Sequence, residues 1–258
     1  MNTASSKIRT VALVGHGAAG KTTLAESLLA ASGAINSRGS VERGNTLLDF
    51  DPLEKEIGHS LQAAMASFQW TGAQVHLIDT PGYPDFMGQA IGALAAVDCA
   101  LLVVNAQTGI ELATERMFNL AGDRGLCRMI VINKIDADNV DLPALVANVR
   151  ERFGKQCLLL DLPVHHGQEV VELLGHDSGD SDFASIAAAH RALIDQIEQQ
   201  PGMGSPTLGK SLDMEGLRTW RIKGFPLIWF YFERADHLDV VRLLGERQDA
   251  VALLMQSS

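Results

Sequence analysis

Gly15-His16-Gly17-Ala18-Ala19-Gly20-Lys21-Thr22 decides the fold that we expect for this chain. The eight residues fill the pattern Gly-x-x-x-x-Gly-Lys-Ser/Thr, in which backbone N–H groups and a helix N-terminus hold a polyphosphate. An apolar run from Val11 to Val14 precedes the stretch, and a helical pattern from Thr23 to Leu29 follows it. This order of strand, glycine loop and helix predicts a phosphate-binding loop and disfavours an accidental glycine turn.

Apolar strands and amphipathic helices alternate beyond this loop. Expected strands cover residues 8–14, 61–70, 74–78, 99–104 and 129–132, with a hairpin turn at 71–72. Expected helices cover 22–31, 112–125 and 142–153, and another begins near residue 84, whereas 34–59 has no steady period and is expected to be a long mobile loop. With the phosphate loop, the pattern predicts an α/β fold of the P-loop NTPase type, a mainly parallel sheet with helices on both faces. Ligands of such sheets bind at the carboxyl ends of the strands.

The sequence pattern changes after Leu162, which suggests that the chain consists of three parts. We expect a G-domain core over 1–162, a small inserted subdomain over 163–199, and a linker with a divergent tail over 200–258. The insert contains a helix capped by Ser181 or Asp182, and its predicted apolar face consists of Phe183, Ile186, Ala187, His190, Ile194 and Ile197. In the tail, the apolar run 225–232 and the segment 235–244 form either a degenerate last strand and helix or unrelated sequence, and we favour the second reading.

Two further motifs follow predicted strands. Asp79-Thr80-Pro81-Gly82 comes after one strand and Asn133-Lys134-Ile135-Asp136 after a later one, and the order of all three motifs is that of a GTPase G domain. Asp136 is expected to accept two hydrogen bonds from guanine, which implies a preference over adenine of roughly 10²-fold or more. Asn133 and Lys134 are expected to brace the loop and cover the base.

The phosphate side of the site is expected to bind GTP or GDP together with Mg²⁺. Lys21 supplies a positive charge to the β and γ phosphates, and Thr22 and Asp79 are metal ligands. Gly82 lets its N–H reach the γ-phosphate. The expected GTP-binding residues in the first motif are Gly15, His16, Gly17, Ala18, Ala19, Gly20, Lys21, Thr22 and Thr23.

These motifs, with the stretches 11–16, 49–70, 78–86, 105–111 and 131–136, resemble the G domain of a translational GTPase. The similarity is closest to elongation factor G and its bacterial elongation-factor-G-like paralogues, and it covers residues 7–198, insert included. It implies GTP hydrolysis, a first switch that closes over the nucleotide, and the ribosome as partner.

Departures from that family bear on catalysis. Ala18 stands where elongation factor G usually has Asp, and Ser60 takes the place of the threonine that closes on Mg²⁺, which makes Ser60 a predicted metal ligand. Tyr83 replaces the histidine that positions the attacking water, and the loss of such a group costs about 10²–10⁴ in rate. We therefore expect Lys21, Gly82 and Tyr83 to support only slow hydrolysis. The alternative is a nonhydrolysing guanine-nucleotide module.

The last base-binding element of the family, a Ser-Ala dipeptide, does not occur in this sequence. The later domains of elongation factor G have no counterpart in what remains after residue 198. We therefore expect a truncated relative, or a remnant, that does not drive translocation alone.

The amino-acid composition limits the other classes of protein to which the chain could belong. The 258 residues are 47% hydrophobic and 20% charged, typical of a soluble globular protein. A net charge of −10 argues against broad binding to DNA or RNA by the body of the protein. No membrane span or leader is recognised, so a cytoplasmic monomer is expected, with Cys99, Cys127 and Cys157 reduced and buried. His16 is read as an exposed loop residue, and Glu54-Lys55-Glu56 as a solvated surface.

Overall fold

The computed structural model describes residues 8–70, 72–154, 157–173, 175–198, 217–221, 227–233 and 238–245. The chain divides into two compact units, Met1–Cys157 and Leu158–Ser258. Leu162, the last residue of the predicted core, belongs to the hydrophobic cluster of the second unit. The three-part division of the sequence remains a prediction.

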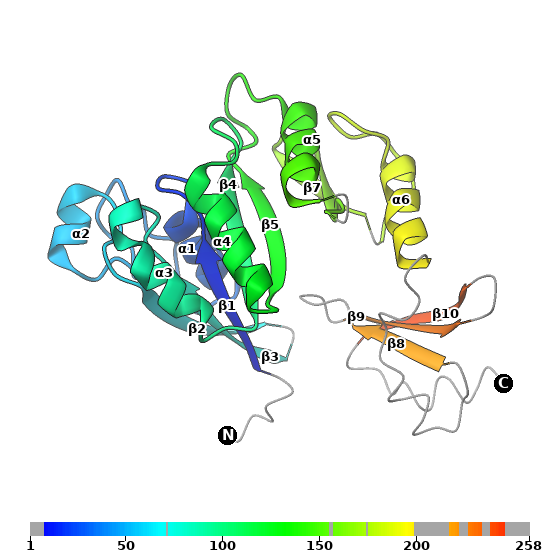
Figure 1. Cartoon of the computed structure of the whole chain (residues 1–258), viewed down its shortest axis with the longest axis horizontal. Coiled ribbons are helices and arrows are strands. Elements are labelled where there is room, and N and C mark those ends of the chain that lie inside the picture. The colour runs from blue at the N-terminus through cyan, green and yellow to red at the C-terminus, as the bar shows by residue number, and fades with distance from the viewer. Residues whose placement is uncertain are drawn as a thin grey trace. The chain divides into compact units, whose positions relative to one another are not determined.

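The first unit is built on a five-stranded sheet (Figure 1). Its strands are β1 (Ile8–Val14), β2 (Ala64–Trp70), β3 (Ala73–Asp79), β4 (Cys99–Asn105) and β5 (Cys127–Asn133), in the order β2-β3-β1-β4-β5. All neighbours are parallel except β2 and β3, which form the predicted antiparallel hairpin. The mainly parallel α/β sheet is therefore confirmed. Because β1, β3, β4 and β5 run the same way, their carboxyl ends meet at one edge.

Helices cover both faces of this sheet, as predicted. One face carries α3 (Met87–Leu94), α4 (Leu112–Asp123) and α5 (Leu142–Phe153), and the other carries α1 (Lys21–Ala31). Neighbouring residues of β1 point to opposite sides: Ala12 and Val14 pack with the α3 and α4 cluster, whereas Leu13 packs with α1. Figure 1 shows α4 in front of the sheet and α1 behind it.

The segment predicted as one long loop, 34–59, contains helix α2 (Pro52–Ile57). Asp51 caps it by accepting a hydrogen bond from the Leu53 N–H at 2.9 Å, and Glu54 accepts a bond from the Asp51 N–H at 3.2 Å. This capping box, with proline in the first turn, is a local signal strong enough to start a helix of six residues.

Two buried carboxylates fix the same segment. Glu26 of α1 accepts hydrogen bonds from the N–H groups of Gly39, Leu47 and Leu48 at 2.6–3.2 Å. Glu54 is 2% exposed, so its reading as a solvated surface residue is wrong. A buried carboxylate is retained where several N–H donors solvate it.

The second unit begins with a hairpin of β6 (Asp161–Val164) and β7 (Glu169–Glu172), followed by α6 (Ile186–Glu198). The cap of α6 differs from the prediction, because the hydroxyl oxygen of Ser185 accepts the Ala188 N–H at 3.4 Å. Ile186 and Leu193 are buried in the cluster of this unit, whereas Ala187 is exposed. The buried face is therefore rotated from the predicted one.

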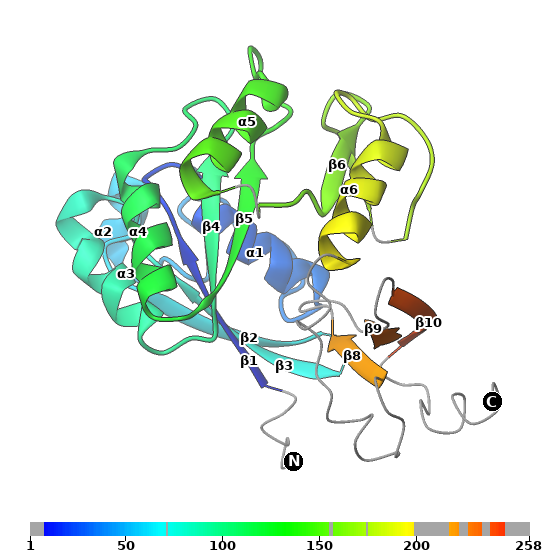
Figure 2. The same cartoon turned by 45° about the vertical axis from the view of Figure 1, so that its right-hand side comes forward.

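A three-stranded antiparallel sheet forms the described part of the tail, with β8 (Leu217–Arg221), β9 (Leu227–Glu233) and β10 (Leu238–Gly245) (Figure 2). Residues 227–232 of the apolar run 225–232 form β9, which belongs to the three-stranded sheet and not to the five-stranded sheet that a last G-domain strand would join; residues 225 and 226 lie outside the described residues. The helix considered for 235–244 is wrong over 238–244, where β10 pairs with β9. Short apolar runs do not separate helix from strand by period alone, and an adjacent apolar strand supplies the pairing partner.

Two remaining expectations concern cysteines and membranes. Cys99, Cys127 and Cys157 form no disulfide within the described ranges, and each is partly exposed rather than buried. Among the helices that the structure describes, none combines the length and apolar character that crossing a membrane requires.

Candidate functional site

A cleft of about 490 Å³ opens at the edge where the parallel strands end. Residues from all three predicted motifs line it, namely Gly17, Ala18, Gly20, Lys21, Thr22, Thr23, Gly82, Tyr83, Asn133, Lys134 and Asp136, together with Ser60. The other predicted site residues, Gly15, His16, Ala19 and Asp79, are buried rather than in its lining. The fold thus brings together segments that are more than a hundred residues apart in sequence.

The phosphate loop has the backbone that its glycines predict. Gly15 and Gly20 have φ values of 140° and 93°, and Ala18 has φ 58°. A side chain on Gly15 would collide with the carbonyl oxygen of Val103 in β4. Gly20 begins α1 without a side-chain cap, and the first turn of α1 has no acidic residue. The free N–H groups of this helix end therefore suit an anion.

Lys21 lies beneath the loop rather than in solvent. It is 6% exposed, and its Nζ donates to the carbonyl oxygens of His16 at 2.7 Å and Gly15 at 3.2 Å. Burial lowers the pKa of Lys21 to about 8, against the opposing effect of the Asp79 and Glu111 carboxylates. The ammonium group is therefore held by backbone oxygens of the phosphate loop.

The three predicted metal ligands lie close together. The Thr22 and Ser60 hydroxyl oxygens are 3.2 Å apart, and Ser60 donates to Asp49 Oδ1 at 2.7 Å. Asp49 is buried and also accepts from the Thr46 hydroxyl at 2.8 Å. Asp49 therefore joins the group of oxygen donors, although the sequence motifs did not single it out.

Asp79 is the most perturbed carboxyl group of this cluster. Burial raises its pKa to about 7, and the nearby Asp49 raises it further, against hydrogen bonds from Thr22 and Thr80 and the charge of Lys21. Its Oδ1 is buried and has no hydrogen-bond partner among the described residues. An unsatisfied buried oxygen is a ready acceptor for a cation or a bound water.

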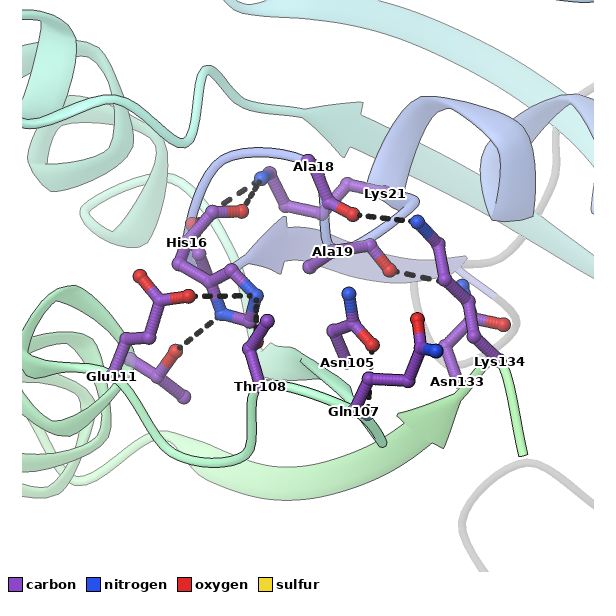
Figure 3. A network of polar contacts seen from close by, with 12 residues as sticks. His16, Ala18, Ala19, Lys21, Asn105, Gln107, Thr108, Glu111, Asn133 and Lys134 are labelled. Carbon is purple, nitrogen blue, oxygen red and sulfur yellow. Dashed lines mark hydrogen bonds and ion pairs between the residues drawn. The ribbon is translucent and has the colours of Figure 1, made fainter. Parts of the chain in front are cut away.

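The guanine motif touches the phosphate loop directly (Figure 3). Asn133 Nδ2 donates to the Ala19 carbonyl at 2.9 Å, and Lys134 Nζ donates to the Ala18 carbonyl at 3.0 Å. Asp136 is exposed in the cleft, so its carboxylate is open to a ligand.

His16 is buried, so its reading as an exposed loop residue is wrong. Its Nδ1 lies 3.3 Å from the Thr114 hydroxyl, and its Nε2 lies 3.2 Å from the Thr108 hydroxyl and 3.3 Å from Glu111 Oε1 (Figure 3). Burial lowers the pKa of His16, and Glu111 opposes this effect. Through these polar contacts the imidazole connects the phosphate loop to the segment that follows β4.

The second motif packs on the first. A Cβ on Gly82 would lie 2.5 Å from the His16 carbonyl oxygen, which leaves room only for glycine. A Cβ on Gly17 would meet the Tyr83 ring at 3.1–3.2 Å, so this ring lies against the phosphate loop.

Sequence reasoning missed several groups of the cleft. Arg38, Val41, Glu42, Asp49 and His59 also line it, and all of them come from the segment 34–59. Residues 34–59 show no helical or strand periodicity. The only signal for Asp49 and His59 was that they lie in the stretch 49–70, which resembles elongation factor G.

A parallel sheet with a phosphate loop after β1, Asp79 at the end of β3 and the guanine motif after β5 defines a P-loop GTPase domain. The family profile described as the elongation factor Tu GTP-binding domain matches residues 6–256. The chain therefore belongs to this family, as a translational GTPase domain related to elongation factor G.

Relatives agree with this assignment. The chain is 42% identical over 153 residues to the tetracycline resistance protein TetW of Butyrivibrio fibrisolvens, covering 59% of this chain and 24% of the relative. It is 38% identical over 157 residues to elongation factor G 2 of Streptomyces coelicolor, covering 61% and 23%. A crystal structure of a Thermus thermophilus protein superposes with a TM-score of 0.68 at 33% identity, covering 81% of this chain and 33% of the other. The chain spans about a quarter of the length of these two curated relatives.

Proposed function

We propose that this chain binds GTP and GDP with Mg²⁺ and hydrolyses GTP slowly. One observation carries the proposal: the phosphate loop, Asp79-Thr80-Pro81-Gly82 and the guanine motif surround one cleft, with Asn133 and Lys134 hydrogen-bonded to the loop. Asp136 selects guanine because its carboxylate accepts from the two N–H groups on one edge of that base.

The oxygen donors fit Mg²⁺. Asp79 has a buried oxygen without a partner in the described part of the chain, and burial raises its pKa to about 7, so a cation would favour the carboxylate form. Thr22, Ser60 and Asp79 would hold the ion, with Asp49 beside them. When bound, the ion neutralises negative charge on the phosphates.

Hydrolysis is proposed to be slow because Tyr83 lies against the phosphate loop at the position where the related factors have histidine. The oxygen of a phenol is a weak base, so it takes a proton from the attacking water poorly. We expect ribosomes to stimulate hydrolysis by this chain about 10²–10⁴-fold less than by a factor that carries the histidine. Equal stimulation would contradict this part of the proposal.

A nonhydrolysing guanine-nucleotide module is the second candidate. Tyr83 and Ala18 favour it, since each replaces a polar family residue beside the phosphates, and the missing Ser-Ala element weakens the base pocket. Single-turnover hydrolysis of bound GTP separates the two candidates. Release of phosphate supports the GTPase, and stable GTP over many hours supports the binding module.

Calorimetric titration with GTP, GDP and ATP in the presence of Mg²⁺ tests binding itself. We expect saturable binding of GTP and GDP and none of ATP. The absence of binding by all three would refute the proposal, and comparable ATP binding would refute the role of Asp136.

We further propose that the chain engages ribosomes in the cytoplasm. The support is family membership and the relatives described as an elongation factor and as a tetracycline resistance protein. Co-sedimentation with ribosomes in the GTP-bound form, but not in the GDP-bound form, is the expected result. Equal co-sedimentation in both nucleotide states would contradict the proposal.

A further inference from the structure

His59 stands at the phosphate end of the cleft and has no role in the motifs above. It follows Gly58, which ends α2 with φ 72°, and it precedes Ser60. The imidazole is half-buried and lines the same cleft as Lys21 and Gly82.

The ring packs on the two aromatic side chains of the opposite segment. Its centroid lies 4.5 Å from that of Tyr83 at an interplanar angle of 48°, and 6.5 Å from that of Phe86. The Tyr83 ring in turn lies against Gly17 of the phosphate loop. The imidazole is therefore one aromatic ring away from the loop that holds the phosphates.

The Nδ1 atom of His59 is buried and makes no hydrogen bond within the described residues. Buried ring nitrogens usually have a partner, because an unmade hydrogen bond costs free energy. A nitrogen in this state beside a phosphate-binding cleft is suited to a bound water molecule.

Contacts on both sides fix the backbone that carries His59. Ser60 lies 3.2 Å from the Thr22 hydroxyl and donates to Asp49. The Glu54 carboxylate accepts the Leu61 N–H at 2.8 Å and the Gln62 N–H at 3.0 Å. Such anchoring limits the positions that the imidazole can take.

We propose that the slow hydrolysis depends on His59, which positions the attacking water from a different segment than the side chain at position 83. The inference rests on the GTP hydrolysis proposed above. The unprotonated ring nitrogen of an imidazole is a stronger hydrogen-bond acceptor than a phenol oxygen, so it holds a water molecule better.

The step balances without any further reactant. The water oxygen forms a bond to the γ-phosphorus, the bond from that phosphorus to the β–γ bridging oxygen breaks, and GDP leaves with the electron pair. One water proton passes to an oxygen of the transferred phosphate, while His59 holds the water by a hydrogen bond. GTP and water thus give GDP and dihydrogen phosphate.

Single-turnover hydrolysis of bound GTP, with GTP and GDP affinities measured separately by calorimetry, tests this role. In His59→Ala we expect unchanged affinities and a rate lower by about 10²-fold or more. Added imidazole should restore part of that rate, and His59→Gln should lie between the two because its amide oxygen can still accept a hydrogen bond from the water. His176→Ala, which changes an exposed histidine outside the cleft, is the matched control.

Three results would overturn the inference. The first is an unchanged rate in His59→Ala. The second is a fall in rate that follows an equal loss of affinity and does not respond to imidazole, which indicates a structural role. The third is a large loss in Tyr83→Phe alone, since that variant keeps the ring and removes only the hydroxyl. GTP that binds to the unaltered chain and is never cleaved would refute hydrolysis and this role together, while leaving nucleotide binding intact.

Discussion

Replacement of Glu54 tests whether one buried carboxylate holds the segment 49–62, which lines the cleft. Its Oε1 accepts the N–H groups of Leu61 and Gln62 at 2.8 and 3.0 Å, and its Oε2 accepts the Asp51 N–H at 3.2 Å. The side chain is 2% exposed, so solvent does not share these bonds. Glu54→Ala leaves all three donors without their acceptor.

The magnitude follows from the bonds lost. Hydrogen bonds to a charged group contribute about 1.5–3 kcal/mol each, and partial access of water to the freed N–H groups reduces the sum to about 3 kcal/mol. Glu54→Gln keeps an oxygen for Leu61 and Gln62 but turns an NH₂ group toward the Asp51 N–H. Its cost is therefore smaller, about 1 kcal/mol.

Hydrogen exchange of the Leu61 and Gln62 amides measures this local stability. About 3 kcal/mol corresponds to exchange that is about 10²-fold faster in Glu54→Ala, with a smaller increase in Glu54→Gln. Glu56→Ala is the control, because Glu56 lies on the same helix with an exposed side chain. Equal amide protection in Glu54→Ala and the unaltered chain would refute the reasoning.

Three further predictions concern other parts of the site. The lowered pKa of His16 means that the folded chain binds this proton less well than the unfolded chain, so stability from His16 is present above pH 6.5 and is lost as pH falls below it. His16→Gln should flatten urea-unfolding stability against pH in that acidic window, and an unchanged slope would contradict this. Gly82→Ala places a methyl group 2.5 Å from the His16 carbonyl, a strain of about 1–3 kcal/mol, so calorimetry should show affinity for a nonhydrolysable GTP analogue falling about 10-fold while that for GDP changes little. Equal losses for both nucleotides would argue against a specific effect on the γ-phosphate side. Asp136→Asn should weaken GDP binding by about 10²-fold without changing thermal stability, since its side chain is exposed, and a lowered melting temperature would show a structural role instead.

Local sequence patterns were enough to predict the five-stranded sheet and the motifs at its edge. A strand, a glycine loop and a helix follow one another within residues 8–31, so their geometry depends on neighbours in sequence. The two later motifs follow β3 and β5, and parallel pairing brings their strand ends to the edge of the phosphate loop. The capping box of α2 is also local, and it was present in the sequence although the lack of a period concealed it.

Contacts between distant residues were not predictable in this way. His16 is buried by Thr108, Glu111 and Thr114, which lie more than ninety residues further along the chain. From the sequence alone Glu54 is expected to be a solvated surface residue. In the fold, backbone N–H groups surround its carboxylate. The strand β10 depends in the same way on pairing with β9 rather than on its own pattern.

The sequence by itself determined the class of domain, the order of β1 to β5 with α1, α3, α4 and α5, and the residue types expected to meet phosphate and guanine. Only the tertiary structure decided which of these groups are buried, which buried oxygens and nitrogens lack partners, and that His59 lies on Tyr83 beside the phosphate loop. The physical reason is that periodicity and motif spacing report on bonds between near neighbours. Burial, desolvation and the pKa shifts of Lys21 and Asp79 arise from groups that only the folded chain brings together.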